Sequence, residues 1–301
     1  MAKGAARTFG QDLMRGEHVV GSGGLTWTGK AAQFDGYRVQ NGERSETATS
    51  GTSIFDPVLC ELAYRWFSPA GGTVLDPFAG GSVRGIVASH LGRPYVGVEL
   101  RGEQVAANVA QRAIAADPLP EWRQGDSRDI ATICADVAAD FVFSCPPYAD
   151  LEVYSTDPAD LSTLAYDQFR QAYGEIIEAA CSLLKEDRFA CFVVGDVRGK
   201  DGCYRNFVGD TVEAFRAAGL GYYNEAILVT AAGSLPIRAG RQFDASRKLG
   251  KTHQNVLVFV KGDPKRAVEA LGTCEFGDVP GAERAGPEPL AEPCPESAAG
   301  V

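Results

Sequence analysis

The chain has 301 residues, a formal net charge of -10 and 45% hydrophobic residues, which is ample for one large domain or two small ones. No apolar run approaches the roughly 20 residues of a membrane-spanning helix, and the start, MAKGAARTFGQDLMRGE, lacks the apolar stretch of a secretory signal. The eight cysteines form no Cys-x-x-Cys pair, and only three histidines are present. This composition predicts a cytoplasmic protein with reduced thiols, no metal site and no membrane partner.

The two ends of the chain differ from its middle. Residues 1–52 show weak periodicity and many Gly, Ser and Thr residues, which predicts an irregular arm with short strands near 25–27 and 37–39. Residues 273–301 hold six acidic residues, one arginine and five prolines. Because such a segment buries too little apolar surface to offset its chain entropy, we expect 273–301 to be a disordered acidic tail.

Strands and helices alternate between the two ends. A helix is predicted from Asp56, because a proline follows an acidic N-cap residue there. The further predicted elements are strands at 73–78, 95–100, up to 125, 140–147, 188–197, 225–231 and 255–262, and helices at 80–92, 103–115, 169–184 and 206–218. No helix is predicted between the last two strands, which suggests an antiparallel edge pair and a long insertion at 232–254. The fold class is therefore α/β, with a doubly wound, mostly parallel seven-stranded sheet.

Polar residues follow the first three predicted strands, at the carboxyl ends where open α/β sheets bind ligands. The first strand runs into DPFAGGS, in which Gly80 and Gly81 permit a sharp turn before a helix N-terminus. Glu99 ends the second strand, where a carboxylate can accept both ribose hydroxyls of a nucleoside. Asp126 could accept from an adenine amine or act as a cap. This spacing fits both dinucleotide and S-adenosylmethionine sites.

The segment SCPPY, residues 144–148, ends the fourth predicted strand. Its two prolines rigidify the turn and leave carbonyl groups with few N–H groups nearby. A rigid acceptor beside an aromatic ring suits a planar base that carries an amino group. Taken alone, Pro-Pro would equally well just stop a strand.

Together DPFAGG, Glu99, GDS (125–127) and PPY (146–148) resemble the S-adenosylmethionine-dependent DNA amino-methyltransferases, which modify the exocyclic amine of adenine or cytosine. The overall sequence is similar to DNA methylases found in bacteriophages. The resemblance covers about residues 53–262, including SIFDP (53–57), VGDVRGKDGCYRNF (194–207) and KLGKTHQNVLVFVKG (248–262). It implies a Rossmann-like methyltransferase domain at 53–272, S-adenosylmethionine as cofactor and double-stranded DNA as partner.

The resemblance also implies roles for single residues. The implied cofactor-binding residues are Asp76, Pro77, Phe78, Ala79, Gly80, Gly81, Glu99, Leu100, Asp126 and Ser127. The implied catalytic residues are Ser144, Cys145, Pro146, Pro147 and Tyr148, with Tyr148 stacking on a flipped-out base. The backbone of Cys145 and Pro146, together with Ser144, is expected to orient the amine. The family usually has Asp, Asn or Ser at the position of Cys145, and often Gly-Ser-Gly at 80–82, so the chain departs from the pattern at both places.

Only 44 residues separate Glu99 from Ser144, which leaves no room for a recognition domain between them. The resemblance then implies that DNA recognition comes from residues after Tyr148, with 232–254 as the recognition insertion. Basic residues there and after the fifth strand lie in loops at the active edge of the sheet, where they can neutralise phosphates or form a solvated face. The predicted DNA-binding residues are Arg198, Lys200, Arg205, Arg238, Arg241, Arg247, Lys248 and Lys251. His253 and Gln254 are expected to hydrogen-bond the loop rather than contact DNA.

Other functions stay open at this point. A carbon-5 pyrimidine methyltransferase would use Cys145 as nucleophile, and RNA is a related substrate. A catalytically inactive DNA-binding relative would keep the fold, with Cys145 as the lesion. A nicotinamide-dependent dehydrogenase fits the glycine turn and Glu99, but the Gly-x-Gly-x-x-Gly spacing is missing and Pro-Pro-Tyr would have no role. Adenine and cytosine are equal candidates for the target, and neither a nuclease partner nor an oligomeric state is predicted.

Overall fold

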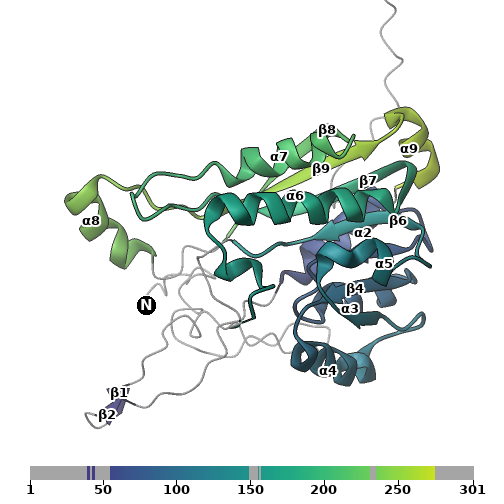
Figure 1. The fold of residues 1–301 in the computed structure, drawn as a ribbon, viewed down its shortest axis with the longest axis horizontal. Coiled ribbons are helices and arrows are strands. Elements are labelled where there is room, and N and C mark those ends of the chain that lie inside the picture. Colours follow the sequence, from purple (N-terminus) through teal and green to yellow (C-terminus); the bar gives the residue numbers. More distant parts are fainter. Residues whose placement is uncertain are drawn as a thin grey trace, which may run out of the picture.

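The computed structural model describes residues 39–40, 43–44, 55–148, 155, 157–230 and 235–274. In this part, a sheet of seven strands, ordered β5-β4-β3-β6-β7-β9-β8, is covered by helices (Figure 1). Its strands are β3 (Val74–Asp76), β4 (Tyr95–Glu99), β5 (Glu121–Gln124), β6 (Ala139–Ser144), β7 (Leu184–Val194), β8 (Gly221–Val229) and β9 (His253–Lys261). A separate hairpin is formed by β1 (Val39–Gln40) and β2 (Glu43–Arg44). The predicted α/β fold class is confirmed.

Strand directions place the ends of five strands together. The strands β3, β4, β5, β6 and β7 are parallel, and β9 runs antiparallel to both β7 and β8. The predicted antiparallel edge pair is therefore confirmed. In register, Asp76 lies opposite Gly97, and Glu99 lies opposite Gln124. As a result, the polar residues that follow β3, β4, β5, β6 and β7 meet at one edge of the sheet.

Apolar side chains alternate between two core layers, one on each face of the sheet. The helices are α2 (Pro57–Phe67), α3 (Val83–His90), α4 (Gly102–Ala110), α5 (Ile130–Ile133), α6 (Tyr166–Ser182), α7 (Phe207–Ala217), α8 (Leu235–Ser246) and α9 (Pro264–Leu271). One layer joins the sheet to α5, α6 and α7, and the other joins it to α2, α3, α4 and α9. In β3, Leu75 enters the first layer and Val74 the second, as the two-residue period of a strand dictates.

Two helices begin with the same local signal. The Asp56 carboxylate accepts from the backbone N–H groups of Val58 and Leu59, with Pro57 in the first turn, so the helix predicted from Asp56 is confirmed. The Asp263 carboxylate caps α9 in the same way, and Pro264 follows it. Helix α9 was not predicted, although the Asp-Pro signal that predicts α2 is repeated before it. The four-residue helix α5 was not predicted either.

The segment between the last two strands corrects a sequence prediction, because helix α8 lies where no helix was expected. Its residues Ile237 and Phe243 are 84% and 44% exposed. Pro236 and Gly240 lie within this segment and are poor helix formers, which argues against a helix from the sequence. In Figure 1, α8 extends away from the body of the sheet at the end of a long excursion of the chain.

Several sequence expectations fall outside the described residues. These are the N-terminal arm apart from β1 and β2, including the strand near 25–27, and the acidic tail beyond residue 274. None of the described helices is both long and apolar enough to cross a membrane. The seven described cysteines are all unpaired. Over the same residues, no group of three or more His, Cys, Asp or Glu side chains could hold a metal ion.

Candidate cofactor and substrate site

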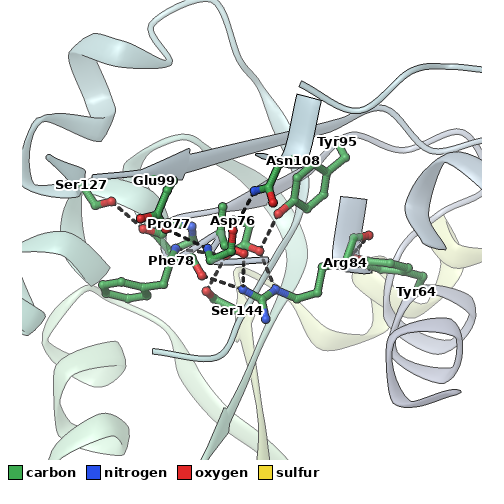
Figure 2. Close-up of polar contacts among 12 residues, drawn as sticks. Tyr64, Asp76, Pro77, Phe78, Arg84, Tyr95, Glu99, Asn108, Ser127 and Ser144 are labelled. Atoms are coloured by element: carbon green, nitrogen blue, oxygen red, sulfur yellow. Dashed lines mark hydrogen bonds and ion pairs between the residues drawn. The ribbon is translucent and has the colours of Figure 1, made fainter. Parts of the chain in front are cut away.

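Asp76 ends β3 and is completely buried, with four hydrogen-bond donors around its carboxylate (Figure 2). Oδ1 accepts from the backbone N–H of Phe78 at 3.0 Å and from the Ser144 hydroxyl at 2.5 Å. Oδ2 accepts from Nε of Arg84 at 2.6 Å and from the Tyr95 hydroxyl at 2.7 Å. These four bonds use the lone pairs that a carboxylate offers. Asp76 therefore supports the following turn from beneath, and its side chain is not available to a ligand.

The buried guanidinium of Arg84 fastens the turn to helix α3 (Figure 2). Besides its ion pair with Asp76, it donates to the carbonyl oxygens of Phe78 at 2.6 Å and Ala79 at 3.0 Å. Burial alone would lower the pKa of Arg84, but the negative charge of Asp76 raises that pKa above its ordinary value. Arg84 was not predicted as a site residue, because charged residues in a helix are usually exposed.

The glycine turn is held by groups from three neighbouring elements. Gly80 has a φ of +48°, a conformation that favours glycine, and its N–H donates to Glu99 Oε2 at 3.0 Å. Its carbonyl accepts from Nδ2 of Asn108 at 2.7 Å. The Ser127 hydroxyl donates to the Pro77 carbonyl at 2.5 Å. The turn is thus fixed by the ends of β4 and β5 and by α4, so little reorganisation is needed to receive a ligand.

Glu99 and Asp126 stand beside this turn and keep part of their carboxylates at the surface. The Glu99 side chain is 11% exposed and also accepts from the N–H of Arg101 at 3.0 Å. The Asp126 side chain is 23% exposed and pairs with Arg128 at 2.5 Å. Each carboxylate already accepts three hydrogen bonds, because Arg101 Nε also donates to Glu99 Oε1 at 3.3 Å and Arg128 donates three times to Asp126. One lone pair of Glu99 Oε2 and one of Asp126 Oδ1 are thus left for a ligand beside the turn. The sheet brings together the predicted positions 76–81, 99–100 and 126–127.

Tyr148 is held in place at the end of the Pro-Pro-Tyr segment. Its hydroxyl oxygen accepts a hydrogen bond from Nε2 of Gln254 and lies 3.8 Å from the sulfur of Cys145. Its ring meets Phe207 edge-on, with 6.0 Å between centroids. Burial raises the pKa of Tyr148 above its ordinary value, so the phenol is neutral near pH 7. The expectation that Gln254 hydrogen-bonds the loop agrees with its contact to Tyr148.

The placement of Ser144 corrects one expected role. Its side chain is completely buried and its hydroxyl donates to Asp76, so Ser144 cannot orient a substrate amine and acts instead beneath the turn.

Burial raises the pKa of the Cys145 thiol, and the opposing charge of Arg84 does not reverse this. A nucleophilic cysteine needs the thiolate form. The environment of Cys145 is therefore unfavourable for the carbon-5 mechanism.

The variant Cys145→Ser is expected to keep methyl-transfer activity within about fivefold of the wild type, because the serine hydroxyl can bond the Tyr148 oxygen as the thiol does, and one such bond contributes about 1 kcal/mol. Initial rates at saturating substrate give the comparison. Cys191→Ser, at a completely buried thiol in β7, controls for loss of folded protein. Complete loss of turnover in Cys145→Ser alone, with the fold intact, would instead assign Cys145 as the nucleophile.

The two predicted basic runs meet on one surface. Arg198 follows β7, and Arg241 and Lys248 belong to α8 and the residues after it. They line a depression of about 490 Å³ together with Gln242, Ala245, Ser246 and Leu249. A second depression of about 340 Å³ is lined by Tyr166, Gly199, Lys200, Asp201, Cys203, Tyr204 and Arg205. Five of the predicted DNA-binding side chains therefore line two depressions on either side of the loop after β7.

The other three predicted DNA-binding residues are placed differently. The Arg247 guanidinium lies over the Phe243 ring at 4.9 Å and pairs with Asp244 at 3.8 Å. The amino group of Lys251 donates to the carbonyl oxygen of Asp196 at 3.4 Å. The side chain of Arg238 lies outside the described part of the chain.

Tyr204 lines the second depression, and its role was not found from the sequence. The Arg198 guanidinium lies 3.9 Å from the centroid of the Tyr204 ring, and the Lys251 amino group lies 5.9 Å from it. The side chain is 46% exposed. An isolated tyrosine in a loop carries no sequence signal. In the structure, however, its ring offers a stacking surface flanked by cations, which is an arrangement suited to nucleic acid.

Comparisons with known proteins give fold-level likenesses only. No family model matches the chain, and no curated protein matches it. TrmN from Thermus thermophilus has a similar structure, with 13% identity and a TM-score of 0.45, over 69% of this chain and 49% of that one. A TehB-like SAM-dependent methyltransferase from Corynebacterium glutamicum has 18% identity and a TM-score of 0.43, over 71% and 91%. Magnesium protoporphyrin IX methyltransferase from Synechocystis, with SAM bound, has 11% identity and a TM-score of 0.43, over 68% and 76%.

The first of these likenesses spans about half the length of the other protein. At such identities and TM-scores, none of the three carries an argument about function.

Proposed function

We propose that this protein transfers a methyl group from S-adenosylmethionine to the exocyclic amine of adenine or cytosine in double-stranded DNA. The observation that carries the proposal is the meeting of three features at one sheet edge: a braced glycine turn, two partly exposed carboxylates and an aromatic residue held after Pro-Pro. A nucleoside cofactor and a planar base would then lie side by side. The basic depressions near the same edge support a nucleic acid as the substrate.

The residues around the turn fit S-adenosylmethionine. Glu99 offers a carboxylate to the two ribose hydroxyls, and Asp126 offers one to the adenine amine. The backbone of Gly80 and Gly81 lies at a helix N-terminus, which suits the carboxylate of the methionine portion. Asp76 and Arg84 hold this turn without touching the ligand. When bound, the cofactor supplies an electrophilic methyl group on a positively charged sulfur.

Replacing Glu99 by alanine is expected to weaken S-adenosylmethionine binding about tenfold to a hundredfold, because hydrogen bonds to a charged group contribute about 1.5–3 kcal/mol. Isothermal titration calorimetry measures the effect directly. Glu103→Ala removes a neighbouring acid of the same type, which lies exposed in the first turn of α4, and should leave the affinity unchanged. An equal loss in both variants would contradict a ribose-binding role for Glu99.

The transfer needs positioning more than chemical activation. The amine nitrogen attacks the methyl carbon with its lone pair, the carbon–sulfur bond breaks, and its electron pair stays on sulfur to give a neutral thioether. The extra proton on nitrogen then passes to water. Because the amine of a duplex is stacked and paired, the base must be flipped out. Tyr148, fixed by Gln254 and Phe207, provides the ring on which the flipped base stacks.

The two depressions would receive the DNA backbone around the flipped nucleotide. Arg198, Arg241 and Lys248 are close enough together to neutralise neighbouring phosphates on one side of the Tyr204 loop. Lys200 and Arg205 line the other side. Tyr204, with Arg198 over its ring, could stack on an unpaired base near the flipped one.

The direct test is transfer of labelled methyl from S-adenosylmethionine to polymeric substrates. Unmethylated duplex DNA, the same sequence as RNA, and denatured protein are offered in parallel, and the label retained by each polymer is counted. We expect label in the DNA, and little of it after Tyr148→Ala. Label in RNA alone, or in none of the three although calorimetry detects cofactor binding, would contradict DNA as the substrate.

A further inference from the structure

Three polar side chains from separate parts of the chain surround one point at the end of β7. A methyl group placed on Gly195 would lie 3.6 Å from the amino nitrogen of Lys251, 3.8 Å from Cγ of Gln254 and 4.0 Å from the Tyr148 hydroxyl. Gln254 lies in β9, Lys251 lies just before that strand, and Tyr148 follows β6. These groups therefore meet beside the aromatic ring on which the proposed substrate base stacks.

The hydrogen bond to Tyr148 fixes which atom of Gln254 remains free. Nε2 of Gln254 donates to the Tyr148 hydroxyl oxygen, so that the amide nitrogen is engaged. Within the described residues, Oε1 has no hydrogen-bond partner. A primary amide carbonyl has two lone pairs and accepts strongly. Gln254 thus presents an unused acceptor next to the Tyr148 hydroxyl.

Among the described residues, other acceptor groups near this point belong to Ser144, Cys145 and Asp196. The Ser144 hydroxyl is buried and donates to Asp76. The sulfur of Cys145 is a poor acceptor and faces the Tyr148 hydroxyl. The Asp196 carboxylate is tied through Oδ1 to the backbone N–H groups of Val197 and Phe207, the second of which begins α7. Oδ2 of Asp196 is the competing acceptor, which the variant Asp196→Asn tests. Among the described residues, Gln254 Oε1 is the unpaired acceptor whose own amide is bonded to Tyr148.

Lys251 places hydrogen-bond donors beside this acceptor. Its amino group donates one hydrogen bond, to the carbonyl oxygen of Asp196 at 3.4 Å, and retains two further N–H groups. Burial lowers the pKa of Lys251, against the opposing effect of Asp196, as expected for an amino group turned inward at a site. An acceptor next to a donor complements an amine that is adjacent to a ring nitrogen. On the Watson–Crick edge, adenine and cytosine share this pair of groups, whereas the ring nitrogen of guanine there is protonated and thymine has no amine.

We propose that Gln254 and Lys251 select the substrate base: Oε1 of Gln254 accepts a hydrogen bond from the exocyclic amine, and Nζ of Lys251 donates to the adjacent ring nitrogen. This inference rests on the proposed function and names the residues that recognise its target. Gln254 then has two tasks, since the same amide holds the Tyr148 ring through Nε2 and reads the amine through Oε1.

The test measures binding of a duplex that carries the methylated site found by labelling. In a second duplex, the target base lacks only its amine: purine replaces adenine, or pyrimidin-2-one replaces cytosine. Fluorescence anisotropy in the presence of S-adenosylhomocysteine gives both affinities without turnover. The wild type is expected to bind the amine-free duplex about tenfold more weakly, because Oε1 is then left unpaired. Gln254→Leu is expected to bind the two duplexes equally.

Matched variants separate recognition from general damage. Gln254→Glu keeps an acceptor and should still prefer the amine. Gln171→Leu removes an exposed amide on α6, bonded to Glu175, and should discriminate as the wild type does. A third duplex carries a target base in which the ring nitrogen next to the amine is replaced by carbon. The wild type should bind this duplex more weakly than the normal one, and Lys251→Met should bind both equally. Lys251→Met should still bind the amine-free duplex more weakly than the normal one.

Distinct results would overturn the inference. If Gln254→Leu still prefers the amine tenfold, the amine is bound elsewhere. If Asp196→Asn abolishes the preference and Gln254→Leu does not, Asp196 is the acceptor. If Tyr148→Phe abolishes the preference for the amine as fully as Gln254→Leu does, Gln254 acts only by holding the Tyr148 ring. Failure of the proposed function is seen separately, as the absence of label in DNA with the wild type, and would contradict both proposals.

Discussion

Replacing Asp76 by asparagine is expected to lower the free energy of unfolding by about 3–5 kcal/mol, the usual cost of removing one partner from a buried ion pair. The substitution leaves the guanidinium of Arg84 buried without its counter-charge, and it removes an acceptor from the Tyr95 hydroxyl. Urea denaturation followed by circular dichroism measures the change. Such a loss is a large part of the total stability of an ordinary domain.

Two further variants decide whether the ion pair causes this effect. Glu61→Gln breaks the exposed pair with Arg65 on α2 and should cost about 0.5 kcal/mol or less. Combining Asp76→Asn with Arg84→Met should cost less than the sum of the single changes, because the double variant leaves no unpaired charge. Strict additivity would show that Asp76 and Arg84 are not coupled, and that the turn is held in another way.

Replacing Arg198, Arg241 and Lys248 together by glutamine is expected to weaken DNA binding roughly a hundredfold at physiological salt. Each of these cations contributes one phosphate contact in the proposed complex. The slope of log affinity against log salt should therefore become shallower by about 3, one for each lost contact. Anisotropy titrations of a labelled duplex at several salt concentrations give both quantities.

A control of equal charge comes from the opposite edge of the sheet. Arg65 and Arg216 lie in the last turns of α2 and α7, and Lys265 lies in the first turn of α9. Each of these turns is at the edge away from Tyr148. Changing these three residues to glutamine should leave the salt slope near the wild-type value. Equal losses in both triple variants would indicate binding through net charge alone and contradict a defined DNA surface.

The alternation of strands and helices, and hence the sheet, could be predicted because it depends on local patterns. The Asp56–Pro57 pair signals a helix start within a few residues, and the buried strands read as short apolar runs. Helix α8 was not predicted, because Pro236 and Gly240 lower the helix propensity of its segment, although its apolar residues recur at a helical period.

The positions of the site were predictable to the extent that they follow strand ends. Asp76, Glu99 and Asp126 meet because parallel strands end at one edge. Side-chain pairing was not predictable, because it joins distant segments. Arg84 turns inward to Asp76, and Gln254 reaches Tyr148 across 106 residues of sequence. The role of Ser144 was mispredicted for the same reason. Its hydroxyl donates to Asp76 on the neighbouring strand and is therefore not available to the substrate.

The chemical identity of the methylated product tests the central claim most directly. Unmethylated duplex DNA is incubated with the protein and S-adenosylmethionine, digested to nucleosides, and analysed by mass spectrometry against standards. We predict a single new nucleoside, either N6-methyldeoxyadenosine or N4-methyldeoxycytidine, that is absent when Tyr148→Ala replaces the wild type. Formation of 5-methyldeoxycytidine, or of no methylated nucleoside at all, would contradict amine methylation of DNA by this protein.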